Sequence, residues 1–155
     1  MATTNIAYGT ETAITWTPGA LADNSARECT AVDNSSNLYV DAMLNITVKA
    51  GSTTPAGEKG AYVWFYGSHD GTDYTDNATG SDAALTMRSP TNLLGPWVVS
   101  IPTASVDYKI IIPSVANFFG GVLPKKWGFV LENKQGGALT TGSTANYTGI
   151  TYTTA

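Results

Sequence analysis

Apolar and polar residues alternate along much of the chain, most clearly in residues 37–50, NLYVDAMLNITVKA, where every second residue from Leu38 to Val48 is apolar. A period of two residues is typical of a β-strand with one buried face and one face toward solvent. On a helix, the same segment would place Asp41 and Asn45 on one stripe with Leu38, where a core could not accept them. The pattern therefore predicts a long strand over residues 37–50, with Leu38 on the buried face.

Shorter segments of the same kind follow at short intervals and end at Gly, Pro, Asn or Asp, which are strand-terminating signals. Parallel neighbours would need long crossover helices, and only residues 114–119 suit even a helical turn. The chain is therefore predicted to be all-β, an antiparallel, jelly-roll-like β-sandwich of about eight strands. The further strands are expected at residues 12–17, 27–32, 61–67, 84–89, 97–101, 106–112, 126–132 and 146–153.

The two ends of the chain are predicted to behave differently. Residues 1–10, MATTNIAYGT, are polar and uncapped, so we expect a flexible N-terminal arm that becomes ordered on docking. Residues 11–155 contain no internal repeat and no linker, which indicates a single β-sandwich domain. Within this domain, the Gly- and Ser-containing stretches 49–60 and 76–84 are expected to be exposed loops.

Charge argues against several classes of partner. Only 13% of the residues are charged, about half the usual share, and the net charge is −4 with Lys125-Lys126 as the one adjacent basic pair. Such a surface would repel a phosphate backbone, so we expect no nucleic-acid binding. No apolar stretch approaches the roughly 20 residues of a membrane span, so we expect no membrane partner. The N-terminus lacks the features of a signal peptide, which favours synthesis in the cytoplasm.

Residues 67–80, GSHDGTDYTDNATG, combine the only histidine with a cluster of acidic side chains. Ser68, Asp70, Gly71 and Tyr74 follow the pattern S-x-D-G-x-x-aromatic. Ser and Asp side chains accept hydrogen bonds from turn amides, and Gly adopts a positive φ without steric cost. The pattern resembles the turn motif called an Asp box, which implies a structural turn.

A calcium site is the alternative interpretation of this loop, with Asp70, Asp73 and Asp76 as ligands. These residues are spaced by three, whereas an EF-hand loop places acids at every second position and ends with a glutamate. His69 has no serine or cysteine nucleophile in a recognisable setting, so we interpret it as a surface residue. The turn is the favoured interpretation.

Other signs of chemistry are sparse. The glutamates are few, no glycine loop has the strand–glycine–helix setting of a phosphate site, and one histidine cannot build a zinc site. Cys29 is the only cysteine, so it forms no internal disulfide, and a buried residue is favoured over a nucleophile. We therefore expect no enzymatic activity and no cofactor.

Three aromatic residues, Tyr62, Trp64 and Tyr66, would share one face of the strand at 61–67. They could pack against the second sheet or a neighbouring subunit, or they could stack on sugar rings. Packing is the favoured interpretation. In both alternatives the aromatic rings are covered, either by protein or by a sugar ligand.

Three segments together resemble small virion structural proteins of tailed bacteriophages: RECTAVDNSS (27–36), YVWFYGSHDGTDY (62–74) and LPKKWGFVLENKQGGAL (123–139). Such proteins look like jelly-roll or sandwich modules, and some are head decoration (cement) proteins. The resemblance implies a protein on the virion head surface that binds the major capsid protein and copies of itself, with a trimer favoured. The alternative is a carbohydrate-binding or host-recognition sandwich of a phage tail.

Overall fold

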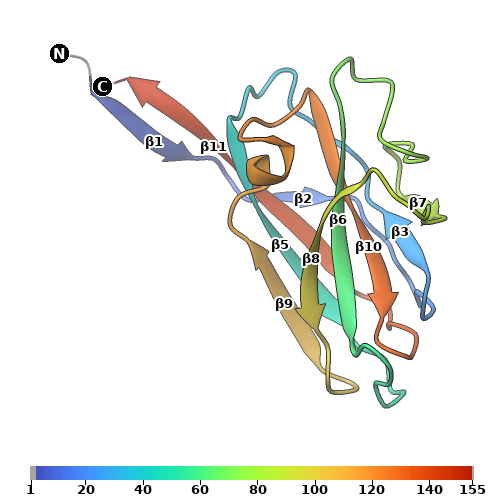
Figure 1. Cartoon of the computed structure of the whole chain (residues 1–155). Helices are drawn as coiled ribbons and strands as arrows, with labels where there is room; N and C mark the ends of the chain where they lie inside the picture. The colour runs from blue at the N-terminus through green and yellow to red at the C-terminus, as the bar shows by residue number, and fades with distance from the viewer. Residues whose placement is uncertain (1–2, 155) are drawn as a thin grey trace.

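The computed structural model describes residues 3–154 and consists of strands apart from one short 3-10 helix, η1 (Figure 1). The strands are joined by loops of varied length, and no helix among these residues is long and apolar enough to cross a membrane. The elements are β1 (Thr4–Tyr8), β2 (Thr12–Ile14), β3 (Ala26–Glu28), β4 (Val32–Asp33), β5 (Asp41–Lys49), β6 (Gly60–Ser68), β7 (Ala83–Leu85), β8 (Leu94–Ser100), β9 (Asp107–Ile112), η1 (Ala116–Phe119), β10 (Lys126–Lys134) and β11 (Thr144–Thr154).

The strands form two antiparallel sheets that pack face to face, which confirms the predicted all-β sandwich. Sheet A has the order β1-β11-β5-β9, with β2 also paired to β11, and sheet B has the order β7-β3-β10-β6-β8, with β4 also paired to β10. Successive long strands change sheet between β5 and β6, between β8 and β9, and again before β10 and β11, which gives the jelly-roll-like connectivity. The strands beyond those expected are short. The segment predicted at 27–32 is divided into β3 and β4.

The main core lies between the sheets. The inward residues of β5, including Leu44 and Ile46, are fully buried, as are Phe65 of β6 and Phe129 of β10. Aromatic contacts link the layers: the ring of Trp16 meets that of Phe129 edge-on, with centroids 5.3 Å apart. The alternation seen in residues 41–49 is thus the alternation between core and solvent-facing sides of sheet A.

The prediction for Leu38 was wrong. Strand β5 begins at Asp41, and Leu38 is 73% exposed with a φ of 53°. The buried side chain of Asn34 causes the difference, because it accepts a hydrogen bond from the Tyr39 amide (2.8 Å) and donates one to the Tyr39 carbonyl (2.9 Å). This side chain closes a turn over residues 34–39, and the strand can start only after it.

Residues 4–8, part of the segment expected to be a flexible arm, form strand β1. They pair antiparallel with the end of β11, from Thr4 opposite Thr154 to Tyr8 opposite Ile150. The first two residues of the expected arm lie outside the described residues. Figure 1 shows β1 and the end of β11 leaving the body of the sandwich as a two-stranded ribbon that carries both termini.

The root of this ribbon is fixed by Tyr39, whose ring lies directly against Gly149 of β11 and next to Gly9. A Cβ atom at position 149 would overlap the ring, so only glycine fits there without movement. The ring of Tyr39 also meets that of Tyr147 edge-on, with centroids 6.4 Å apart. Tyr39 thereby connects the turn at 34–39 to the last strand.

We therefore expect Gly149→Val to destabilise the fold by about 1–3 kcal/mol, because the added side chain must displace the Tyr39 ring. Urea unfolding monitored by circular dichroism measures this change. Thr148→Val is the matched control, since Thr148 lies on the opposite, half-buried face of the same strand. Equal stability of the two variants would contradict the proposed role of the Tyr39 contact.

Candidate functional site: the two outer sheet faces

The outer face of sheet B carries the three aromatic residues singled out in the sequence, and they lie at different depths. Tyr62, Trp64 and Tyr66 share this face of β6, while Val63 and Phe65 face the core. Tyr62 and Trp64 are half-buried, but Tyr66 is fully buried. Tyr66 is therefore closed to a sugar ring, and it packs against neither the second sheet nor another subunit.

Tyr66 is held by contacts within its own chain. It lies opposite Gly128 of β10, where a side chain would collide with its ring. Its hydroxyl donates a hydrogen bond to the Cys29 carbonyl (2.6 Å). Burial raises the pKa of the Tyr66 hydroxyl, and burial also raises the pKa of the Cys29 thiol to about 12. Both groups stay protonated and neutral at ordinary pH, as a structural role requires.

The segment between β6 and β8, residues 69–93, covers Tyr66 from outside and builds a second hydrophobic cluster on this face. We call this segment the covering loop. The expectation that residues 76–84 form a purely exposed loop was wrong, because Ala78 packs into the cluster and Asp82 and Ala83 are half-buried. The cluster is made of buried Ala26, Tyr66, Leu85, Leu93 and Val130, with Ala31, Trp64, Tyr74, Ala78 and Met87 packed around them.

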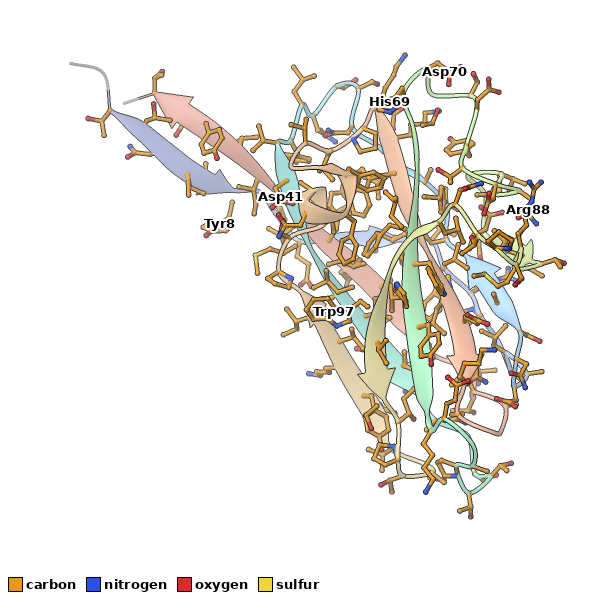
Figure 2. The ribbon with its side chains drawn as sticks, viewed as in Figure 1. Tyr8, Asp41, His69, Asp70, Arg88 and Trp97 are labelled. Atoms are coloured by element: carbon orange, nitrogen blue, oxygen red, sulfur yellow. The ribbon has the colours of Figure 1, made fainter. Side chains whose placement is uncertain are left out.

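The covering loop starts with the turn predicted at residues 68–74, which lies at one end of the molecule (Figure 2). Asp70 Oδ1 accepts hydrogen bonds from the amides of Thr72 (2.8 Å) and Asp73 (2.9 Å). The Ser68 hydroxyl donates to Asp70 (2.9 Å) and accepts from the Gly71 amide (2.8 Å). Gly71 has a φ of 92°, and these bonds lower the pKa of the Asp70 carboxyl well below its usual range.

Two features complete this turn. The Tyr74 ring folds back and meets Tyr66 edge-on, with centroids 5.7 Å apart. The ring also lies directly against Gly80, whose φ is 74°. His69 is exposed beside Asp70. Tyr74 therefore transmits the turn geometry to the second cluster.

The three aspartates considered as calcium ligands are not brought together. Asp76 accepts hydrogen bonds from the Thr91 hydroxyl (2.7 Å) and the Asn92 amide (2.8 Å), which fasten the far end of the covering loop. Asp70 is engaged within its own turn, and Asp73 is exposed. Within residues 3–154, no group of three or more His, Cys, Asp or Glu side chains could hold a metal ion.

The middle of the covering loop is fastened by Glu28 and Asp82, which the sequence did not single out. Glu28 is buried and accepts hydrogen bonds from the Thr79 amide (2.9 Å), the Thr79 hydroxyl (2.8 Å) and the Gly80 amide (3.2 Å). Asp82 forms an ion pair with Arg27 (2.6 Å) and accepts from the Thr17 amide (3.0 Å). The only signal in the sequence is an acid in an otherwise buried strand, at Glu28.

Beside the covered region, Tyr62 and Trp64 form a half-buried aromatic pair with polar neighbours. Their rings meet edge-on, with centroids 6.5 Å apart. The Trp64 indole donates to Glu132 (3.2 Å), which also pairs with Lys134 (2.9 Å). The Tyr62 hydroxyl donates to Glu58, which raises the pKa of the Tyr62 hydroxyl. The arrangement offers ring edges to a ligand beside two carboxylates, which already accept hydrogen bonds within the chain.

The outer face of sheet A differs, because its centre is open and uncharged. Ile111 of β9 is 60% exposed, next to the half-buried Met43 and Asn45 of β5 and the Asn146 and Thr148 side chains of β11. These residues line a shallow hollow of about 180 Å³, with Glu11 at its rim. The same face continues into the protruding ribbon. Such a surface is suited to protein contacts. The sequence pattern did not distinguish it from an ordinary solvent-facing side of a sheet.

Comparison with known proteins adds no relative. The chain matches no protein-family model, no curated protein and no solved structure.

The acidic fasteners predict how the covering loop responds to pH. Asp70, Asp76 and Asp82 all have a lowered pKa in the folded protein. Backbone amides cause the shift at Asp70. At Asp76 and Asp82, burial opposes the shift, but hydrogen bonds to each carboxylate outweigh it. A lowered folded-state pKa gives stability that is present above the unfolded value, about 3.9, and is lost as pH falls through the folded value.

We therefore expect the urea midpoint to fall between about pH 5 and pH 2.5, with amides of residues 69–93 losing protection from hydrogen exchange before those of β5. Asp70→Asn should be less stable at pH 6 and should show a smaller pH dependence. Asp73→Asn is the matched control, because within residues 3–154 its side chain accepts no hydrogen bond. The same pH dependence in wild type and Asp70→Asn would contradict this assignment.

Proposed function

We propose that the protein is a structural component of a tailed-phage virion, a decoration (cement) protein of the head. In this role it binds the major capsid protein lattice and copies of itself on the head surface. It is made in the host cytoplasm and stabilises the particle by contact, without turnover and without a cofactor. The proposal rests on the resemblance of residues 27–36, 62–74 and 123–139 and on the character of the open sheet face.

The observation that carries the proposal is the open, uncharged centre of the outer face of sheet A together with the ribbon that projects from it. The charged residues Lys49, Asp107 and Lys109 of this face lie at the end of β5 and β9 away from the ribbon. Exposed Ile111 and the exposed ribbon residues Ile6, Tyr8 and Tyr152 give this side a large apolar share. Residues 135–154, which include β11, carry no charge at all. An uncharged face can be buried against another protein at little desolvation cost, and many modest contacts in a lattice add up through avidity.

The opposite side supports the same role. The covering loop covers part of the outer face of sheet B and is held there by carboxylates. Because these carboxylates are engaged in hydrogen bonds and ion pairs, they are not free for chemistry. Glu28 and Asp82 are taken up in this way, and Glu132 is paired with Lys134 and Trp64. A protein that must survive as a rigid shell component gains from such closure. We therefore assign binding to sheet A and rigidity to sheet B.

The first test is the place and copy number of the protein in purified particles of its phage. We expect density for the sandwich on the outside of the head and a copy number in the hundreds by quantitative mass spectrometry. Particles that lack the protein should release DNA at a lower temperature, and purified protein should restore the wild-type temperature. A low copy number with density on the tail would overturn the head assignment.

A second candidate function is sugar binding, favoured by the Tyr62–Trp64 pair beside Glu58 and Glu132. Aromatic rings next to carboxylates can stack on sugar rings and accept hydrogen bonds from their hydroxyls. On a glycan array this candidate predicts binding that Trp64→Ala abolishes while circular dichroism stays unchanged. Trp97→Ala is the matched control. Trp97 is 39% exposed on β8 and pairs with the core residue Val63, so it lies on the other face of sheet B from Trp64. No binding by the wild-type protein would remove this candidate.

A further inference from the structure

The ribbon formed by β1 and the end of β11 has one apolar face. Residues directly opposite each other in an antiparallel pair share a face, and so do residues two apart. Ile6 lies opposite Tyr152, and Tyr8 lies opposite Ile150. Ile6, Tyr8 and Tyr152 are 59%, 66% and 63% exposed, respectively. All four side chains therefore project from the same side, and three of them are largely uncovered.

The ribbon also has an open hydrogen-bonding edge along β1. The Gly9 amide donates to the Gly149 carbonyl (2.8 Å), in the same register as the β1–β11 pairs. Because bonding direction alternates along an antiparallel strand, Asn5 and Ala7 also point their backbone groups toward β11. The N–H and C=O groups of Thr4, Ile6 and Tyr8 point to the other side, where β1 is the last strand of sheet A within residues 3–154.

This edge lacks the usual protection against pairing. Exposed edge strands are normally blunted by Lys, Pro, a bulge or a covering segment. Residues 3–10, TTNIAYGT, contain no charged residue and no proline, and the β1–β11 register runs without a shift. A two-stranded ribbon that projects from its sheet is also only marginally stable in water on its own. Both properties favour a further strand on this edge.

We propose that this further strand is β1 of a second copy of the protein, paired antiparallel about a two-fold axis through Ile6. In this register Ile6 of one copy lies opposite Ile6 of the other, and Thr4 lies opposite Tyr8. Since these three residues carry the outward backbone groups, the pairing forms about six N–H···O bonds. The two ribbons become one continuous sheet with the order β11-β1-β1-β11.

A second copy is the occupant because the edge is complementary to itself. The two-fold operation brings identical uncharged strands together, so neither side chains nor net strand charge oppose the contact. It also places both apolar faces on the same side, where Ile6, Tyr8 and Tyr152 of each copy form one cluster. A partner recognised by charge would find no charged group on residues 3–10.

The size of the contact sets its strength. Three partly exposed side chains per copy bury only some hundreds of Å², below the roughly 1,600 Å² of a standard interface, so the dimer is weak and concentration-dependent. The inference deepens the proposed virion role by naming how copies contact each other. It can be tested on the purified protein without capsids, so its failure is distinguishable from the failure of the capsid assignment.

The test measures mass by sedimentation velocity over a range of concentrations. We expect wild type to shift from monomer to dimer, and Ile6→Lys to stay monomeric because it places two ammonium groups opposite each other. Asn5→Lys is the matched control: it adds the same charge to the opposite face of β1 and should dimerise like wild type. Thermal unfolding checks that each variant is folded, which is expected because Ile6 lies outside the core.

The decisive measurement mixes two variants. Ile6→Lys and Ile6→Glu should each be monomeric alone but should form a mixed dimer when combined, because the two substituted positions lie opposite each other only in the proposed register. Absence of the mixed dimer, or a wild-type chain that stays monomeric at all concentrations, would overturn the inference. Trimers in place of dimers would also overturn it, since a trimer requires β1 to pair with a different edge of the next copy.

Discussion

The burial of Tyr66 under residues 69–93 is the constraint on which the rest of the structure depends. A tyrosine that is fully buried, as Tyr66 is, needs a hydrogen-bond partner for its hydroxyl. Gly128 leaves the space for the ring, the Cys29 carbonyl accepts from the hydroxyl, and Tyr74 and Leu85 cover it. This one arrangement links β6, β10, the end of β3 and the covering loop, so the outer face of sheet B is covered around Tyr66 while its inner face lies in the core.

The outer face of sheet B is partly covered by residues 69–93, whereas the centre of the outer face of sheet A is open. The inner face of sheet A is in the core, while its outer face runs from Ile111 across the hollow beside Asn146 to the ribbon. Asp41 stands where the ribbon leaves the body and accepts hydrogen bonds from the amides of Ala42 (2.7 Å) and Ala116 (2.8 Å), which ties η1 to β5 (Figure 2). The root of the ribbon is therefore well anchored, and sheet A sets the direction in which the ribbon leaves the body.

The sequence pattern predicted the class of fold and most strand positions, because period-two alternation is a local signal. It failed where a single side chain decides a distant or irregular feature. The Asn34 side chain closes a turn that delays the start of β5 until Asp41 and leaves Leu38 exposed. The alternation of apolar and polar residues does not reveal such a turn. Strand β1 escaped notice because TNIAY is short and its partner lies at the other end of the chain. The sequence placed Tyr62, Trp64 and Tyr66 on one shared face of β6, but the cover over Tyr66 came from a segment of the same chain whose composition suggested an exposed loop.

The acidic residues explain why so little chemistry is visible in this chain. Within residues 3–154, every aspartate and glutamate except Glu11 and Asp73 accepts a hydrogen bond or an ion pair from another group of the protein. Most of these partners are backbone amides or hydroxyls of loops. A carboxylate used in this way fixes a loop without a matching cation, because the amides supply the compensating dipoles. The chain can therefore be poor in Lys and Arg and still hold long irregular segments in place. The acidic net charge is then in part a consequence of how the loops are held in place.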